Sequence, residues 1–417
     1  MADSRGPDVV IAGGGIAAAA TAIRLRALGL SVGLVVRELP PLPGIEAIPL
    51  RALELFDVLG EPDVAEEAGA VEVEGPAHEW HGAAGRVPAR FVHVDRVALA
   101  AQLLSRAELR GATVQRTPRL PRPEDVPATT VALVDGTGRA AAWSRPVQTQ
   151  GSAVAWQFRA PPADEVAGRI VRGDGWWAYR LGHAGASWVG VVTAAGTLAP
   201  SVLESAAGRL GVPPESMVAQ GRRPAWVQHA AQPVSGRRIA VGDAALAHDP
   251  IAGQGIRFAL GSAIAAAATV ATWAGDPSRR EIATGYYRNL VEAEAVRHRT
   301  ALDELANPYQ QAPSRPEPPT EPAVVRFRAD VVQTELSVDG RIEVGPAVRV
   351  RDGRTVRWVG AYDLLDLARL AADPTPRMLV VAGLLEAGLD VATARALVSW
   401  ALGNGVLIDA AESGDSW

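Results

Sequence analysis

The chain has 417 residues and a mass of 43.6 kDa, with 48% apolar residues, 21% charged residues and a net charge of −5. This length predicts two or three domains, and this composition excludes wholesale disorder. The acidic balance, with a pI near 5.9, indicates neither a nucleic-acid partner nor binding to an anionic membrane surface.

Two residue types are missing from the sequence. The absence of cysteine excludes disulfides, thiolate metal sites, a catalytic thiol and a redox-active CxxC pair. All 41 basic residues are arginine, so a catalytic, Schiff-base or phosphate-binding lysine is excluded as well. The N-terminus lacks the apolar core of a signal peptide, and the longest apolar run, 258–273, is too short to span a membrane and predicts a buried helix. We therefore expect a cytoplasmic protein.

The first predicted elements form a β-turn-α-turn-β unit. An apolar run at 8–12 predicts a strand, the glycines and alanines after it predict a turn and a helix, and 31–36 predicts a second strand. Such a unit is typical of a parallel α/β sheet. The later patterns predict helices over 49–69 and 95–110, a strand in 129–139, an antiparallel sheet over 150–194 and a strand in 237–246.

A proline-rich segment divides the chain. Five prolines in residues 311–322 predict a stiff extended linker between a first part, 1–310, and a separate unit, 323–417. The second unit shows Asp-Gly turns, three helical stretches and a short last strand, and it resembles a winged helix. Its turns are expected at 339–340 and 352–353, its helices at 361–372, 376–388 and 390–405, and its last strand at 405–408.

The first motif with chemical meaning is GGGIAA at 13–18, which matches the GxGxxA dinucleotide-binding fingerprint directly after a strand. Gly13 allows the tight turn, Gly15 lets the backbone approach a pyrophosphate, and Ala18 allows the helix to pack closely on the strand. The N-terminus of the helix supplies N–H donors for the phosphates.

The acidic residue that completes this fingerprint is displaced. It usually ends the second strand and binds the adenosine ribose, but Val36 occupies that position, and Arg37 and Glu38 follow it. Either a local bulge lets Glu38 bind the ribose, or this contact is missing. We include both Arg37 and Glu38 in the predicted cofactor-binding set.

The second motif is a strand that ends in Gly-Asp and is followed by a proline, a GxG and a helix. This arrangement resembles the second FAD motif of glutathione-reductase-type flavoproteins, and more narrowly that of the p-hydroxybenzoate-hydroxylase and flavin-halogenase group. In that family the Asp binds the ribityl chain, and the Pro and GxG backbone lies against the isoalloxazine ring. The resemblance implies that the chain binds FAD, with contacts from Gly242, Asp243, Pro250, Gly253, Gln254 and Gly255.

Two further stretches extend the resemblance over residues 8–300. VDRVALAAQLL is similar to the family's helix whose arginine approaches the pyrophosphate, which places Arg96 there. VDGTGR resembles the family's D-A-T-G-R strand end, with Gly136 in place of the usual alanine. The implied fold is α/β: a glutathione-reductase-like, Rossmann-type FAD domain, an antiparallel-sheet substrate subdomain inserted at about 70–95 and 145–235, and the small α+β winged-helix-like C-terminal domain.

Other stretches resemble the halogenase-like branch of this group, namely GIE at 44–46 and the DP-x-x-x-QG pattern at 249–255. That branch contains tryptophan halogenases and also the LodB-like maturation flavoproteins of quinone-cofactor enzymes, which hydroxylate a peptide-borne Trp. Halogenases of this branch use an active-site lysine, which the chain lacks, and their WxWxIP motif is degenerate here, at 176–179. Halogenation is therefore disfavoured.

A reduced flavin in this fold reacts with oxygen to give a C4a-hydroperoxide, an electrophilic oxygen donor toward electron-rich rings. The protein must then exclude water and supply an acid or a base, and the candidates are His248 and Asp249. Packing is an equal alternative for His248, and for Asp249 turn formation is the favoured interpretation. Trp176, Trp177 and Tyr179 are candidates for an aromatic substrate pocket, with sheet core as the alternative. His93 and His183 have no motif support, and we expect structural roles for them.

The source of electrons and the role of the second unit stay open. No second GxGxxG follows a strand, so the reductant is NAD(P)H bound transiently or reduced flavin from a partner reductase. The second unit resembles the winged-helix modules that recognise peptides, whereas a DNA-binding helix would be basic, and 390–405 carries only Arg395. A lid or a dimerisation domain is the alternative.

These observations predict an FAD-dependent monooxygenase that hydroxylates an aromatic side chain, Trp, of a peptide or protein during its maturation. The alternatives are a small-molecule aromatic hydroxylase, a flavin-dependent halogenase and a non-catalytic flavoprotein chaperone.

Overall fold

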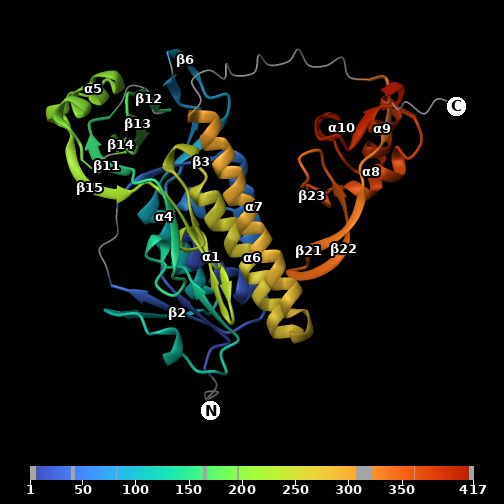
Figure 1. Ribbon diagram of the computed structural model, residues 1–417, viewed down its shortest axis with the longest axis horizontal. Coiled ribbons are helices and arrows are strands. Elements are labelled where there is room, and N and C mark those ends of the chain that lie inside the picture. Colours follow the sequence, from blue (N-terminus) through green and yellow to red (C-terminus); the bar gives the residue numbers. More distant parts are fainter. Residues whose placement is uncertain are drawn as a thin grey trace. The chain divides into compact units, whose positions relative to one another are not determined.

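The computed structural model describes residues 6–38, 43–80, 82–162, 167–194, 197–306, 322–360 and 362–412. The predicted linker, 311–322, lies almost wholly outside them. The chain has a mixed α/β fold and forms two compact units, 1–308 with 339–341 and 309–338 with 342–417. Figure 1 shows the elements of each unit.

A six-stranded sheet, mostly parallel, forms the centre of the first unit. Its strands, in order across the sheet, are β17 (Val234–Ser235), β18 (Arg238–Ala240), β9 (Ala132–Asp135), β1 (Val9–Ala12), β2 (Val32–Arg37) and β8 (Thr113–Thr117). Only β17 runs antiparallel to its neighbour. The predicted β-turn-α-turn-β unit at the N-terminus is therefore confirmed, with β1 and β2 paired in parallel.

Apolar residues on both faces of this sheet are buried, as expected for a parallel sheet covered on each side. The helices of this unit are α1 (Ile16–Ala27), α2 (Glu54–Leu59), α3 (Val64–Glu67), α4 (Arg96–Leu109), α5 (Pro200–Leu210), α6 (Gly255–Gly275) and α7 (Arg280–Ala306). Helix α1 contacts α4 and α6, and α6 and α7 lie side by side (Figure 1). On the opposite face of the sheet, Val10 and Leu133 pack against Val126 and Trp143.

Helix α6 confirms the predicted buried helix but is longer than the sequence indicated. By length and composition it could cross a membrane, yet 78% of its apolar window is buried inside the protein. It is therefore a core helix. The single helix expected over 49–69 is wrong: a 3₁₀ turn (Leu50–Leu53), α2 and α3 share this stretch. The break falls at Gly60, which caps α2 in the left-handed conformation, with φ +74°.

The antiparallel sheet expected over 150–194 is confirmed, and it belongs to a larger mixed sheet in which one pair of neighbouring strands is parallel. Seven strands lie in the order β15 (Val218–Pro224), β11 (Val154–Ala160), β14 (Ala186–Thr193), β13 (Trp176–His183), β12 (Arg169–Gly173), β5 (Ala77–Trp80) and β6 (Ala83–Arg86). Helix α5 covers one face, where Trp176, Ala178 and Leu210 share an apolar core. Two smaller sheets complete the unit: β3 (Ile45–Pro49), β7 (Arg90–Asp95) and β4 (Val71–Glu74), and β10 (Val147–Gln150), β16 (Val227–Ala230) and β19 (Leu246–Ala247).

The second unit has its own core. Its helices are α8 (Leu364–Leu370), α9 (Arg377–Glu386) and α10 (Val391–Gly403), and its strands are β20 (Val324–Phe327), β21 (Val331–Val338), β22 (Arg341–Arg349), β23 (Thr355–Val356), β24 (Trp358–Val359), β25 (Tyr362–Asp363), β26 (Thr375–Pro376) and β27 (Leu407–Asp409). Val325, Leu364, Leu384 and Leu397 meet in one buried cluster. The three predicted helices and the terminal strand are present, although α8 is shorter than expected because Asp363 caps its N-terminus.

Candidate functional site

Three glycine-containing turns meet at the carboxyl edge of the parallel sheet. They follow β1, β9 and β18, and hold Gly13, Gly136 and Gly242. Backbone hydrogen bonds join them, from the Gly136 N–H to the Ala12 carbonyl and from the Val241 N–H to the Asp135 carbonyl, at 2.8 and 2.9 Å. In open α/β sheets this edge is where ligands bind. The fold therefore places the two predicted FAD motifs together.

Helix α1 holds these turns in contact. A Cβ added at Gly13 would overlap the Gly136 carbonyl, and one at Gly242 would lie 2.7 Å from the Ala17 Cβ. A methyl group at Gly136 would lie 2.7 Å from the Ala18 Cβ. The glycine that replaces the family's usual alanine is therefore required here, because Ala18 already fills the space between helix and strand.

Other motif glycines leave open space, which is the property a cofactor needs. A Cβ on Gly15 or Gly255 would meet nothing within 4 Å. Gly15 precedes α1 and Gln254 precedes α6, and neither helix start has a side-chain cap or an acidic residue in its first turn. The free N–H groups and the positive end of each helix suit a phosphate and an electron-rich ring edge. The residues present therefore fit FAD.

The end of the second strand differs from the prediction. Strand β2 pairs with β8 in a regular register from Gly33 to Arg37, so the bulge that was to bring Glu38 into the ribose position is wrong. The Val36 side chain instead points at the first turn, where a Cβ on Gly14 would lie 2.7 Å from it. Arg37 and Glu38 are both exposed at the strand end.

The second motif forms two short turns before α6. Gly242 and Asp243 lie in a 3₁₀ turn, and the buried Gly242 N–H donates to the Ser262 hydroxyl at 2.9 Å. Asp249 caps the next turn, Pro250–Ala252, through a 2.9 Å hydrogen bond from the Ile251 N–H. Gly253 ends this turn with φ +57°, a conformation that favours glycine. The turn role foreseen for Asp249 is thus present, and burial, opposed by the Ile251 N–H and by Arg139, raises the pKa of its carboxyl.

An arginine cluster lies between these turns and the antiparallel sheet. Arg139 donates to the carbonyls of Trp226 and His248 at 2.6 and 2.9 Å, and its Nε lies 3.9 Å from the Asp243 carboxylate. Burial lowers the pKa of Arg139 and of Arg223, and the charge of Arg96 lowers both further, whereas Asp243 opposes the shift of each. Partly buried guanidinium groups of this kind suit an anion, and the diphosphate of FAD is one.

The opposite side of the cluster reaches the sheet. Arg96 lies 3.4 Å from the Glu46 carboxylate, and Glu46, Arg223 and Arg96 all act on the pKa of Tyr179, which burial raises. Arg223 in turn is attracted to Asp243. The charges of Glu46, Arg96 and Arg223 thus surround Tyr179, and one of them, Arg223, also interacts electrostatically with Asp243.

The side chain of Tyr179 extends across the neighbouring strand β14 to a hydrogen-bond partner on β11. Its ring lies over Gly190, where a Cβ would overlap it, and its hydroxyl accepts a 2.8 Å hydrogen bond from the Gln157 amide. The ring of Trp177 is 5.6 Å from that of Tyr179 on the same face. Trp176 points the other way, into the core under α5, so its predicted place in the pocket is wrong.

His248 is also placed differently from its predicted catalytic role. Only 2% of its side chain is exposed, and its ring packs on Phe258 of α6 and His298 of α7, with ring centroids 5.2 and 4.6 Å apart. Its Nε2 lies 3.3 Å from the Glu294 carboxylate. This environment supports the packing alternative and does not support proton exchange with a substrate.

The sequence reasoning missed several residues of this region. Arg139 stands at the end of the VDGTGR motif and Glu46 in the GIE segment, so both had a signal that was not used. Gln157 and Arg223 lie in ordinary strand sequence, and only the cross-strand pairing of β11 with β14 and β15 brings them to the site. The Nε2–H of His183 donates to the Gly69 carbonyl and the Nδ1–H of His93 donates to the Gly182 carbonyl, both at 2.9 Å, as structural residues do.

Comparisons with protein-family models and with curated protein sequences find no match to this chain. Solved structures do match. QhpG, a peptidyl tryptophan dihydroxylase essential for tryptophylquinone cofactor biogenesis, is 22% identical, with a TM-score of 0.67 over 96% of this chain and 100% of that one. CmlS, a flavin-dependent halogenase, is 15% identical, with a TM-score of 0.66 over 98% and 97%.

A third structure, PqsL of P. aeruginosa in complex with 2-aminobenzoylacetate, is 17% identical, with a TM-score of 0.57 over 72% of this chain and 97% of that one. These likenesses establish the fold. The chain has the fold of flavin-dependent monooxygenases and halogenases, and the resemblance seen in its motifs is confirmed at that level.

Proposed function

We propose that this protein is an FAD-dependent monooxygenase that hydroxylates an aromatic side chain, Trp, of a peptide or protein. The observation that carries the proposal is that one unit holds both a set of glycine turns suited to a dinucleotide and a sheet face with two aromatic side chains. Gly15 and Gly255 leave open space at two helix starts, and Trp177 and Tyr179 share one face of the antiparallel sheet, where the charges of Arg96 and Arg223 act on Tyr179.

FAD, when bound and reduced, supplies an activated oxygen that attacks an electron-rich ring. The balanced reaction consumes the ring C–H, O₂, two electrons and two protons, and yields the ring C–OH and water. The electrons come from NAD(P)H or from the reduced flavin of a partner reductase. We assign the diphosphate to the α1 start with Arg96, the ribityl chain to Asp243, and the isoalloxazine ring to the turn from Pro250 to Gly255.

This chain's side chains hold the substrate and the protons in the proposal. Tyr179 accepts its hydrogen bond from Gln157, so its own O–H is left to donate to the substrate. Trp177 provides a face for ring stacking. The half-buried Asp249 carboxyl, with its raised pKa, is the remaining candidate for an acid or base, since the buried ring of His248 is out of reach.

Two observations favour a peptide hydroxylase over its rivals. QhpG acts on peptidyl tryptophan, and its likeness extends over nearly all of this chain, including the second unit, whereas the likeness to PqsL covers 72%. The complete absence of lysine weighs against the halogenation that the CmlS likeness would otherwise suggest. We assign peptide recognition to the second unit as a winged-helix-like module, and we place the protein in the cytoplasm.

The test is oxygen incorporation. The FAD-loaded protein is supplied with a flavin reductase, NADH and ¹⁸O₂, and is offered a library of Trp-containing peptides, free tryptophan and simple phenols, with chloride and bromide present. Mass spectrometry showing one or two ¹⁸O atoms on a peptide Trp supports the proposal. Oxygen on the free compounds alone, chlorine or bromine on the ring, or no product at all would each overturn it.

Two tryptophan variants provide the matched control. Trp177→Leu lowers turnover at least tenfold, because it removes the stacking face, and lowers the stability only slightly. Trp176→Leu destabilises the core under α5 by about 2–3 kcal/mol but leaves the turnover of the folded fraction close to wild type. Equal turnover by both variants would contradict the assigned pocket face.

A further inference from the structure

One buried face of α7 contacts the segment that contains the Pro and GxG of the second motif, residues 248–255. Glu294 and His298 are one helical turn apart on α7, and both are buried, with 4% of each residue exposed. Spacing of four residues places two side chains on the same face of a helix. Neither residue belongs to a sequence motif, and the reaction proposed above uses neither.

His298 holds the start of this segment. Its Nε2 accepts a 3.1 Å hydrogen bond from the backbone N–H of Asp249. An accepting nitrogen carries no proton, so the ring must be neutral with its proton on Nδ1. Burial, and then the neighbouring His248, lower the pKa of His298 to about 4, which keeps the ring neutral near pH 7.

Glu294 holds the other end through Arg257 of α6. The Arg257 guanidinium donates to the Glu294 carboxylate and, through Nε, to the Gln254 side chain. Arg297 donates to the second oxygen of Glu294, and His248 approaches the first at 3.3 Å. Burial alone would raise the pKa of Glu294, but His248, Arg297 and Arg257 together hold it well below its usual range. The carboxylate is therefore charged and keeps Arg257 in place.

We propose that Glu294 and His298 are positioning residues, which fix residues 249–254 from behind in the conformation that receives the isoalloxazine ring of FAD. The inference rests on the FAD site proposed above and adds residues that touch neither cofactor nor substrate. Asp249 and Gln254, at the two ends of the segment, are each tied to α7, directly or through Arg257. The ring-binding turn is thereby ordered before the cofactor arrives.

Acid should loosen this arrangement at one point. Protonation of His298 replaces the acceptor of the Asp249 N–H by a donor. The charged and titratable groups that face the ring are His248 of the segment, Glu294 and Arg297 of α7, and Arg257 of α6 through Glu294. Wild-type protein should therefore lose FAD affinity as the pH falls toward 4, and a variant with a non-titrating acceptor should lose less, because only the Asp249 carboxyl of the same segment, whose pKa burial raises, still titrates there.

The experiment measures the FAD dissociation constant of apoprotein by fluorescence titration, with thermal unfolding of the apoprotein as a check on folding. His298→Leu, which has no acceptor, should weaken FAD binding about tenfold, whereas His298→Gln should stay within about threefold of wild type. Trp273→Phe is the matched control, since it removes a hydrogen bond between the same two helices at their far end, from the Trp273 indole to the Arg280 carbonyl. It should lower the melting temperature and leave FAD affinity unchanged.

FAD binding by a folded His298→Leu protein with wild-type affinity, at neutral and at acid pH, would overturn the inference. Should that variant fail to fold, Arg257→Met decides, because Arg257 is partly exposed and its loss frees Gln254; unchanged affinity there overturns the inference equally. Failure of the wild-type protein to bind FAD would instead refute the proposed function itself, so the two outcomes are distinguishable.

Discussion

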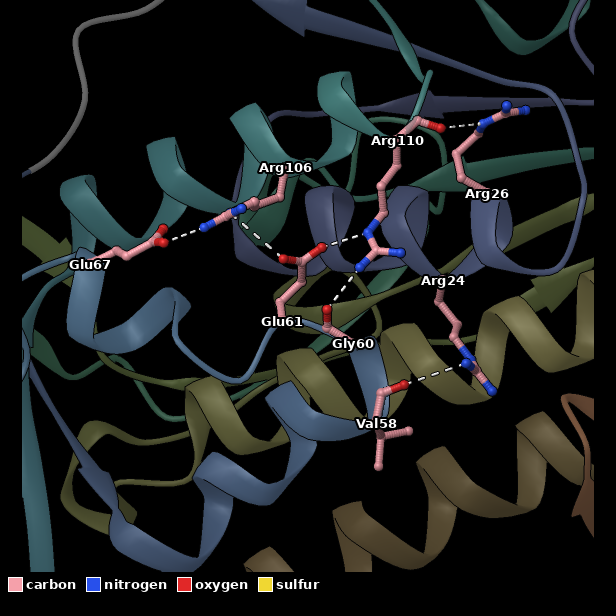
Figure 2. Close-up of polar contacts among 8 residues, drawn as sticks. All are labelled: Arg24, Arg26, Val58, Gly60, Glu61, Glu67, Arg106 and Arg110. Carbon is pink, nitrogen blue, oxygen red and sulfur yellow. Dashed lines mark hydrogen bonds and ion pairs between the residues drawn. The ribbon is translucent and has the colours of Figure 1, made fainter.

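Two buried glutamates in this protein have almost the same surroundings and different positions. The Glu61 side chain is 7% exposed and contacts Arg106 of α4 and Arg110 at its C-terminal cap, and the Glu294 side chain is 6% exposed and contacts Arg257 and Arg297. Figure 2 shows the first cluster, in which Arg106 also reaches Glu67. Each carboxylate is thus compensated by two arginines, as a buried charge requires.

The difference lies in what each cluster holds. The Arg110 side chain also donates to the Gly60 carbonyl, and the Arg110 backbone carbonyl accepts a hydrogen bond from Arg26 (Figure 2). The Glu61 cluster therefore joins α1, α2 and α4 to one another. The Glu294 cluster holds the turn between β19 and α6, which contains a cofactor motif. A buried ionic cluster is therefore no sign of function by itself, and the segment it immobilises decides its role.

Removing each carboxylate in turn tests the difference between the two clusters and should have the largest effect. Glu61→Ala and Glu294→Ala both remove a carboxylate that compensates two arginines and should lower the free energy of unfolding by about 2–3 kcal/mol, less than for fully buried pairs because the arginines are partly exposed. Only Glu294→Ala should also weaken FAD binding. Urea unfolding and FAD titration of both variants test this, and equal FAD affinities would contradict the distinction.

Two glycines, Gly136 and Gly15, test the same contrast between a role in packing and a role in binding. Gly136→Ala forces a methyl group against Ala18 and should cost about 1–3 kcal/mol of stability, which Ala18→Gly in the same chain should largely restore. A double-mutant cycle by chemical denaturation measures this coupling. Strictly additive effects would show that the two positions do not share one space.

Gly15→Ala is the opposite case. The new methyl group enters open space, and the backbone at Gly15 is extended, so the stability should change by less than about 0.5 kcal/mol. FAD affinity should fall at least tenfold because the methyl group occupies the place of the diphosphate. Calorimetric titration of the folded variant measures the FAD affinity. An unchanged affinity would show that the FAD diphosphate does not bind at Gly15.

The last expected effect is a change in pH dependence. The unfolded chain protonates His298 near pH 6.5 but the folded chain only near 4, so between these values the unfolded state binds more protons and stability falls as the pH falls. One such group contributes a slope of about 1.4 kcal/mol per pH unit within that window. His298→Gln should flatten the stability profile there by about this amount.

His93 serves as the control for this profile. Burial lowers its pKa as well, but it contacts the Gly182 carbonyl and not the segment 249–254. His93→Gln should therefore flatten the stability profile in the same direction and leave the pH dependence of FAD affinity as in wild type. An identical response of FAD affinity in the two variants would mean that His298 acts through global stability alone.

Local sequence patterns predicted most of the elements of the fold. The alternation of apolar runs with glycine turns predicted β1, α1 and β2, and the Asp-Gly pairs predicted the turns at 339–340 and 352–353, because these features depend on neighbouring residues only. The helix expected over 49–69 failed at Gly60, where a left-handed cap outweighs the helical pattern on each side.

The candidate site shows the same difference between residues that a local pattern predicts and residues that depend on distant contacts. Gly13, Gly15, Gly242 and Gly253 were found from spacing, since their role is a backbone conformation or an open space. The face on which an aromatic ring lies depends on strand register and on what packs behind the sheet, so Trp176 and Trp177 could not be separated in advance. Arg223, Gln157, Glu294 and His298 act through contacts between distant elements, and no local pattern marks them.

Binding of FAD to the purified apoprotein tests the central claim most directly, measured by equilibrium titration for wild type and for Asp243→Asn. The account predicts one FAD per chain with a dissociation constant of ~1 μM or lower, and affinity at least tenfold weaker in Asp243→Asn, which stays folded because this carboxylate is partly exposed and its nearest described cation is 3.9 Å away. No saturable binding by the wild-type protein, or equal binding by both proteins, would contradict it.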